Sequence, residues 1–191
     1  MKKIILASQS PWRKTILEKL GISFDVVVSN FEEDMTLHMS PNELALSRAM
    51  GKARAVAVMH PDALVLGADT FVVHEGVLFG KPLTPERAKE MLMSLKGKWH
   101  DIMTGFVIID GQSGESIEEV VTTRVHIRDA DESEIDSYVQ TGEPLNVAGG
   151  YAIQGRAGAL IDKIEGDYWN IVGLPMSAVV VALKKFGITP Q

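Results

Sequence analysis

Asp69 lies in the middle of an apolar run, and a carboxylate in that setting is a strong chemical signal. Residues 63–73 read ALVLGADTFVV and predict a central buried strand. A buried carboxylate is destabilising unless it has a partner, so an acid placed there is typical of a metal ligand or a general base. The alternative is an aspartate that only hydrogen-bonds to a neighbouring turn. Gly67, two residues earlier, would let another backbone or a ligand approach the strand closely.

A second group of polar side chains surrounds the predicted start of a helix. Residues 8–14 read SQSPWRK, so the hydroxyls of Ser8 and Ser10 accompany the cations of Arg13 and Lys14. The unpaired backbone N–H groups and the dipole at a helix N-terminus favour an anion. The segment lacks the G-x-x-x-x-G-K-[ST] pattern and is therefore not a P-loop. The simpler alternative is that Ser10 only caps the helix while both cations are solvated.

Further charged residues would complete a site for a metal and for phosphates. Glu33 belongs to the acidic run EED at 32–34, which alone is typical of a solvated loop. Beside Asp69 it would form an all-oxygen site for Mg²⁺ or Mn²⁺. Lys52 lies at the edge of the apolar stripe of a predicted helix, and Lys81 stands between a glycine and a proline. Each would bind phosphate. The alternatives are that Lys52 only snorkels to the solvent and that Lys81 is an ordinary turn lysine. Carboxylates, cations and a helix start together are what phosphoryl transfer requires.

The elements that must position these residues alternate between strands and helices. We predict strands at 3–8, 24–29, 63–73, 102–109, 117–127 and 159–164, a hairpin turn at 74–76, and helices at 11–20, 40–57, 84–97, 131–142 and 175–186. The second helix begins with a capping box from Ser40 to Glu43. This alternation predicts an α/β fold with a mixed twisted sheet and flanking helices. No repeat or linker divides the chain, so we expect a single domain over 1–191.

Composition excludes several classes of function. The chain has 191 residues, of which 46% are hydrophobic and 23% charged, as in ordinary globular proteins. It has no cysteine, which excludes disulfides and thiolate zinc sites, and its five histidines are not spaced as metal-ligand pairs. The net charge of −6 argues against broad nucleic-acid binding. No apolar run approaches the ~20 residues that span a bilayer, and the N-terminus does not resemble a signal peptide. We therefore expect a cytoplasmic protein without a membrane partner.

Several short motifs, in order and with matching spacing, resemble the Maf family of nucleotide pyrophosphatases along nearly the whole chain. They are LASQSPWR (6–13), NFEED (30–34), AMGKA (49–53), GADT (67–70), GKPLT (80–84), TG (104–105), AGGYAIQGRAG (148–158) and IVGLP (171–175). The resemblance implies a fold related to the inosine triphosphate pyrophosphatases, with two lobes around a cleft, and a homodimer. It also implies hydrolysis of a nucleoside triphosphate to monophosphate and pyrophosphate with a divalent metal.

The resemblance assigns roles to the residues described above. Asp69 would accept the proton of the attacking water and, together with Glu33, would organise the metal. Arg13, Lys52 and Lys81 would bind the triphosphate, and the catalytic group would consist of Asp69, Glu33 and Lys81. The remaining functional positions of the family fall on Ser8, Ser10 and Gln154.

Three positions bear on the choice of base. Family members that resemble dTTP/UTP pyrophosphatases tend to carry Arg, Thr and Gln there, whereas those acting on 7-methyl-GTP tend to carry Trp first and Glu last. This chain has Trp12, Thr70 and Gln154. The amide of Gln154 offers a donor and an acceptor, which suits uracil or thymine, while stacking by Trp12 is largely indifferent to the base. We therefore expect dTTP, UTP and modified pyrimidine nucleotides to be preferred, with 7-methyl-GTP as the alternative.

Two other functions are compatible with the sequence. A non-catalytic, nucleotide-binding regulator of cell division is one, although such a protein would not need the general base at Asp69. A phosphatase that removes the terminal phosphate is the other, and the residues alone do not separate it from α–β cleavage. Analysis of the products distinguishes these functions from that of a pyrophosphatase that removes unwanted nucleotides, because only the pyrophosphatase releases pyrophosphate and a nucleoside monophosphate.

Overall fold

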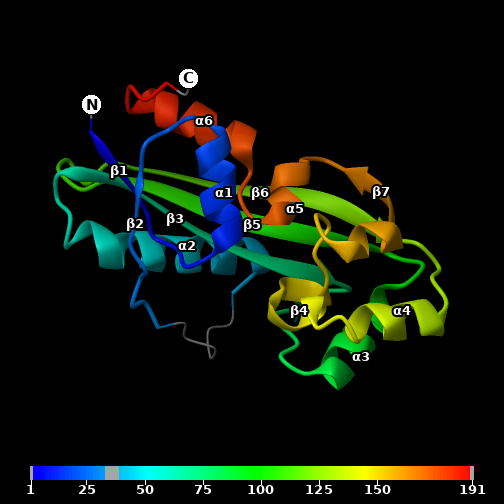
Figure 1. Cartoon of the computed structure of the whole chain (residues 1–191). Helices are drawn as coiled ribbons and strands as arrows, with labels where there is room; N and C mark the ends of the chain where they lie inside the picture. Colours follow the sequence, from blue (N-terminus) through cyan, green and yellow to red (C-terminus); the bar gives the residue numbers. More distant parts are fainter. Residues whose placement is uncertain (1, 33–38, 190–191) are drawn as a thin grey trace. The chain divides into compact units, whose positions relative to one another are not determined.

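The computed structural model describes residues 2–32 and 39–189 of the protein (Figure 1). In chain order its elements are β1 (Lys3–Leu6), α1 (Pro11–Lys19), β2 (Asp25–Val26), α2 (Pro41–Ala57), β3 (Ala63–His74), β4 (Val77–Phe79), α3 (Pro85–Leu95), β5 (Trp99–Asp110), β6 (Ser116–Ile127), α4 (Glu132–Val139), β7 (Ile161–Glu165), α5 (Tyr168–Val172) and α6 (Met176–Lys185). Short 3₁₀ turns named η1 (Glu143–Asn146), η2 (Ala148–Gly150) and η3 (Arg156–Leu160) lie between α4 and β7.

The strands form a mixed sheet. Among the described residues seven strands join it, in the order β2-β1-β3-β5-β6-β7, with β4 paired to β3. Strand β1 runs parallel to both β2 and β3, whereas β4 is antiparallel to β3 and β7 is antiparallel to β6. The predicted α/β class with a mixed sheet and flanking helices is therefore confirmed.

The chain divides into two compact units. The first consists of Met1–Asp69, Thr104–Val121 and Gly173–Gln191, and the second of Thr70–Met103 and Thr122–Val172. Strands β3, β5 and β6 therefore each contribute residues to both units, and β3 passes from one to the other directly after Asp69.

In the first unit, helices cover both faces of the sheet: α1 and α6 lie on one face and α2 on the other (Figure 1). Helix α2 lies very close to the strands. A Cβ atom at Gly67 of β3 would be 2.4 Å from the carbonyl oxygen of Ala49, and one at Gly105 of β5 would be 2.5 Å from that of Ala45. The two glycines therefore let α2 rest on the strand backbones, and the close approach expected at Gly67 is made by this helix.

The second unit has its own core, to which α3, α4 and the strands contribute side chains. Its buried members include Val72, Ala88, Leu92, Leu95, Ile102, Val125, Ile135, Tyr138, Tyr151 and Leu160. Tyr151 is 4% exposed, and its hydroxyl lies 2.6 Å from Nε2 of buried His100. Burial, with smaller effects of His74 and His126, lowers the pKa of His100 to about 3. His100 is therefore neutral in the folded protein at neutral pH.

Most elements begin and end near their predicted positions. The capping box of α2 is present: the backbone N–H of Ser40 donates to Glu43 Oε2 at 2.9 Å, and the N–H of Glu43 donates to Ser40 Oγ at 3.4 Å. Strands β1 and β2 are shorter than predicted, and β2 is an exposed edge strand that pairs with β1 over only two residues. Helix α5 is not predicted, since its five residues are too few for a helical pattern.

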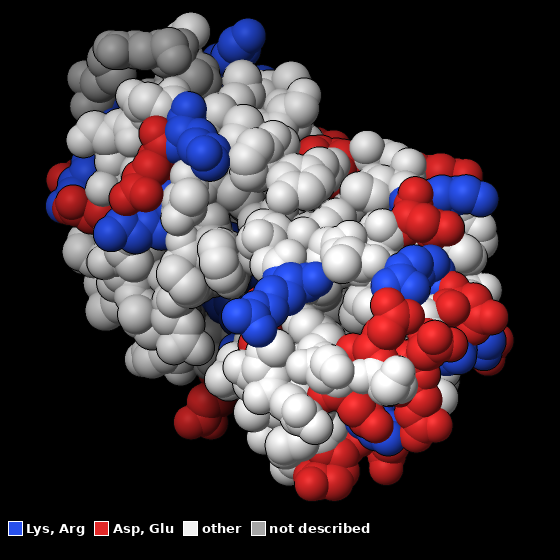
Figure 2. Space-filling view, turned by 45° about the vertical axis from the view of Figure 1, so that its right-hand side comes forward, with Lys and Arg blue, Asp and Glu red and all other residues white. Residues whose placement is uncertain are grey.

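The surface is mixed in charge. No helix in the described part of the chain is long and apolar enough to cross a membrane. On the face that Figure 2 presents, Lys and Arg side chains are interspersed with Asp and Glu and form no continuous basic surface. Ion pairs of Lys89 with Glu132 and Asp136, each 2.7 Å long, are an example from α3 and α4. The lack of a nucleic-acid partner stays a prediction.

Candidate functional site

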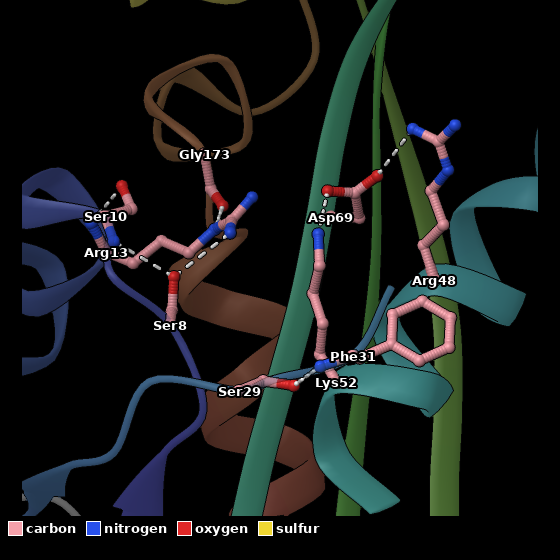
Figure 3. A network of polar contacts seen from close by, with 9 residues as sticks. All are labelled: Ser8, Ser10, Arg13, Ser29, Phe31, Arg48, Lys52, Asp69 and Gly173. Atoms are coloured by element: carbon pink, nitrogen blue, oxygen red, sulfur yellow. Dashed lines mark hydrogen bonds and ion pairs between the residues drawn. The ribbon is translucent and has the colours of Figure 1, made fainter. Parts of the chain in front are cut away.

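Asp69 lies on the face of β3 that α2 covers. Because side chains alternate along a strand, Asp69 shares this face with Gly67, on which α2 rests. Its side chain is only 12% exposed. Its Oδ1 accepts a hydrogen bond from Nζ of Lys52 at 2.7 Å, and its Oδ2 lies 3.6 Å from Nη1 of Arg48 (Figure 3). Asp69 is therefore held by two cations of one helix. This excludes the alternative that it only hydrogen-bonds to a neighbouring turn.

Arg48 is a site residue that the sequence analysis missed. It precedes Lys52 by four residues, so both side chains leave the same face of α2. Their exposed fractions are 16% for Arg48 and 18% for Lys52, which shows that Lys52 is not a snorkelling surface lysine. The available signal was the pair of cations one turn apart, bordering an apolar stripe that must pack on a strand containing an aspartate.

The start of α1 forms the second group. Ser10 is the N-cap, and its Oγ accepts a hydrogen bond from the N–H of Arg13 at 3.4 Å. Ser8 Oγ accepts two hydrogen bonds of 3.2 Å, one from the N–H of Ser10 and one from Nη1 of Arg13. Nε of Arg13 donates to the carbonyl oxygen of Gly173 at 2.8 Å. Arg13 is therefore fixed in place, and the solvated alternative holds only for Lys14, whose side chain is 56% exposed.

The sheet brings the two groups close together within the first unit. Parallel pairing of β1 with β3 aligns Leu6 with Leu66, so the segment after β1 runs beside the part of β3 that carries Asp69. Figure 3 shows Ser8 on one side of Asp69 and Arg48 on the other. An ion-paired carboxylate thus lies beside a helix N-terminus, and an anion bound there would adjoin Asp69.

Glu33, the second acid predicted for the metal, lies outside the described residues. The chain just before it packs on α2: a Cβ at Gly51 would be 2.3 Å from the ring of Phe31, whose N–H donates to Ser29 Oγ at 3.1 Å. Within the described residues, no group of three or more His, Asp or Glu side chains is arranged to hold a metal ion. Of the two predicted metal ligands, the structure therefore describes only Asp69.

Lys81 belongs to the second unit, in the segment between β4 and α3. Its side chain is exposed. The carbonyl of Gly80 accepts a hydrogen bond from the N–H of Gly149 at 3.0 Å, and the N–H of Leu83 donates to the carbonyl of Leu145 at 3.1 Å. These bonds fix the backbone on both sides of Lys81 while its side chain extends outward, which is compatible with the predicted phosphate ligand.

The three predicted specificity positions are divided between the units. Trp12, on α1 in the first unit, is 44% exposed. Thr70 is half-buried and follows Asp69 on β3, and Gln154 is half-buried in the turn before η3. Both belong to the second unit. Their roles toward a base stay predictions.

The whole chain was also compared with known proteins. A family model described as "Maf-like protein" matches residues 3–186. Two relatives named "dTTP/UTP pyrophosphatase", from Bacillus cereus strains G9842 and ATCC 10987 / NRS 248, are each 46% identical over 188 residues, which cover 98% of this chain and 97% and 92% of theirs. A solved structure of the Staphylococcus aureus Ham1 protein matches with a TM-score of 0.48 and 14% identity, over 82% of this chain and 90% of that one. Because the family match runs through β1, the start of α1, α2 and Asp69 to the end of α6, the chain belongs to the Maf-like family.

Proposed function

We propose that this protein hydrolyses nucleoside triphosphates to a nucleoside monophosphate and pyrophosphate, and that dTTP, UTP and modified pyrimidine nucleotides are its preferred substrates. The observation that carries the proposal is the mostly buried cluster of Asp69, Lys52 and Arg48 beside the start of α1 (Figure 3). The pyrimidine preference is supported by the names of the two Bacillus cereus relatives. Such an activity would clear unwanted nucleotides from the pool.

The triphosphate is assigned to the start of α1 and to the cations around it. Backbone N–H groups at a helix N-terminus bind phosphate, and a planar guanidinium such as that of Arg13 matches phosphate oxygens. The contacts of Arg13 with Ser8 and Gly173 hold that guanidinium in place before a substrate arrives. Lys81 of the second unit is proposed as a further phosphate ligand.

Asp69 is the proposed general base. As the water oxygen forms a bond to the α-phosphorus, Asp69 accepts the water proton. The bond from that phosphorus to the bridging oxygen breaks, and its electron pair leaves with pyrophosphate. Lys52 and Arg48 hold the carboxylate, and a triphosphate would compete with Asp69 for both cations.

We propose Mg²⁺ or Mn²⁺ as the cofactor. The described donor set fits a metal that arrives with the substrate, because Mg²⁺ is commonly bound by one or two carboxylates together with substrate phosphates. Asp69 would hold it, together with Glu33 as the sequence indicates. When bound, the metal supplies positive charge that stabilises the leaving pyrophosphate.

Hydrolysis in ¹⁸O-labelled water tests the bond that is cut. With UTP and Mg²⁺ or Mn²⁺, we expect the label in UMP and unlabelled pyrophosphate in equal amount. Label found only in released phosphate or pyrophosphate would reject attack at the α-phosphorus. Release of the terminal phosphate would indicate a phosphatase, and binding without turnover would indicate a regulator.

A panel of UTP, dTTP, CTP, GTP and 7-methyl-GTP tests the choice of base. We expect the highest kcat/KM for UTP and dTTP. If 7-methyl-GTP is hydrolysed best, Trp12 is a better guide to the substrate than Gln154. A homodimer and a cytoplasmic location are further proposals from the sequence, which light scattering and cell fractionation test.

A further inference from the structure

The turn that carries Gln154 is held at its beginning by Tyr138. This tyrosine belongs to α4 and is 5% exposed. Its hydroxyl donates a hydrogen bond to Oε1 of Glu143 at 3.0 Å. The same hydroxyl accepts the N–H of Ala152, two residues before Gln154, at 3.3 Å. One buried hydroxyl therefore links the start of the turn to a carboxylate.

Glu143 holds the end of the same turn. Its Oε2 accepts the backbone N–H of Arg156 at 3.1 Å, and its Oε1 accepts that of Ala157 at 3.5 Å. Gly155 makes room for the carboxylate, because a Cβ atom there would lie 2.4 Å from Oε1 of Glu143. Backbone N–H groups on both sides of Gln154 therefore donate hydrogen bonds to Tyr138 and Glu143.

The chemistry of this pair suits a rigid support. The Tyr138 hydroxyl must donate and accept at once, and burial, more than its contact with Glu143, raises the pKa of Tyr138, which keeps the hydroxyl protonated. Hydrogen bonds to a carboxylate are stronger than bonds between neutral groups. Tyr151, next to Ala152, is held in turn by His100 at 2.6 Å. Fixed neighbours on both sides restrict the orientations that Gln154 can adopt.

An amide discriminates between bases only when its orientation is fixed. Uracil and thymine present an acceptor at O4 and a donor at N3, whereas cytosine presents a donor at N4 and an acceptor at N3. Rotating a glutamine amide by half a turn exchanges its own donor and acceptor, so a loosely held amide would pair with either pattern. Selectivity follows when the wrong base leaves a polar group unpaired.

We propose that Tyr138 and Glu143 are positioning residues for base selection, which fix the turn at 152–157 and thereby present the amide of Gln154 in one orientation. This inference rests on the proposed function, in which Gln154 pairs with uracil or thymine. Neither residue touches the substrate in this scheme. Their effect is on the ratio of kcat/KM for UTP to that for CTP.

Tyr138→Phe is the first test, because it removes both hydrogen bonds of the hydroxyl and keeps the buried ring. We expect the UTP-to-CTP ratio of kcat/KM to fall by about 10-fold, mainly through a higher KM for UTP. Glu143→Gln, which keeps the size and part of the accepting capacity, should lower the ratio less. Glu132→Gln is the matched control: this acid lies in the exposed first turn of the same helix, and the ratio should not change.

A double-mutant cycle separates positioning from a general loss of structure. In a Gln154→Ala background there is no amide to orient, so Tyr138→Phe should leave the UTP-to-CTP ratio unchanged. Amide hydrogen exchange should also show faster exchange at Ala152 and Arg156 in the single variants. An equal fall of the ratio in both backgrounds, or an equal loss of activity on all nucleotides, would mean a structural role and overturn the inference.

The outcome for the wild type separates the two proposals. A wild-type protein that hydrolyses no nucleoside triphosphate would overturn the proposed function and this inference with it. An active wild type whose UTP-to-CTP ratio is unaffected by Tyr138→Phe would overturn this inference alone. If Tyr138→Phe does not fold, the same measurements on Glu143→Gln decide the question.

Discussion

Asp69 in the first unit and Tyr138 in the second are held by different means. In the first, Asp69 is held mainly by the opposite charges of Lys52 and Arg48. In the second, Tyr138 and His100 take part in hydrogen bonds inside the core. An ion pair can exchange one anionic partner for another, such as a triphosphate, whereas a buried hydrogen-bonded group that loses its partner is left unsatisfied. The first unit is thus suited to a highly charged ligand that comes and goes, and the second to a surface that keeps its shape.

The largest effect should come from removing the charge at the centre of the first unit. Asp69→Asn keeps the shape of the side chain but removes the proposed base, so kcat for UTP should fall by roughly 100- to 10,000-fold. Folding should be retained, because the amide still accepts a hydrogen bond from Lys52. Steady-state kinetics and circular dichroism check both points. Turnover near the wild-type value would assign the base to another residue, with Glu33 the first to test.

The next effect tests the hydrogen-bonding character of the second unit. Gln154→Glu replaces a donor and acceptor by a group that only accepts, so kcat/KM for UTP should fall by about 10- to 100-fold. Trp12→Arg changes stacking and should lower it much less. Measuring both variants with UTP and with 7-methyl-GTP checks the comparison. A larger loss in Trp12→Arg would show that stacking decides the choice of base.

Arg48 tests whether both cations of the first unit matter. Arg48→Met removes the charge and keeps most of the length, so kcat should fall by about 10-fold because Asp69 loses one of two partners. Arg48→Lys, which restores a cation, should recover most of that loss. Lys14→Met is the control for removing an exposed positive charge, and its kcat should match that of the wild type. If Arg48→Lys is as impaired as Arg48→Met, charge is not the property that Arg48 contributes.

The last effect is on stability and not on catalysis, and it concerns the pH dependence of the second unit. The pKa of His100 is lowered to about 3 from 6.5, so as pH falls below 6.5 the unfolded chain binds a proton that the folded protein does not. The free energy of unfolding should therefore decrease as pH falls from 6.5 toward 3, by about 1 kcal/mol per pH unit from this group. His100→Gln should flatten that slope, and urea denaturation at pH values of about 7 and 5 measures it. If His100→Gln has the same slope as the wild type, other groups set the pH dependence. His60→Gln is the control for the loss of a histidine.

Sequence reasoning was most successful where the interacting residues are close along the chain. The caps at Ser10 and Ser40 each involve a residue three positions later, so the pattern of letters contains the whole interaction. Asp69 was also singled out, because a carboxylate in an apolar strand is unusual in itself. Its need for a partner could be predicted, and Lys52 was considered, but Arg48 was missed. The position of Arg48, four residues before Lys52, points to Asp69 only when α2 is also taken to pack on β3.

Other features depend on packing that no local pattern contains. In the turn that carries Gln154, Glu143 accepts hydrogen bonds from the backbone N–H groups of Arg156 and Ala157. The sequence indicates this interaction only through the glycine at 155. A glycine at that position is equally typical of a flexible loop. Knowing that a carboxylate occupies the missing side-chain space required the fold of the second unit.

The absence of side chains at Gly67 and Gly105 has a consequence for engineering the protein. Because α2 rests on the backbones of β3 and β5, the height of the helix above the sheet is set by main-chain atoms, and even one added methyl group would lift it. Lifting α2 would carry Arg48 and Lys52 away from Asp69 together. Libraries that seek new nucleotide substrates should therefore hold α2 and these strands constant and diversify the turns of the second unit.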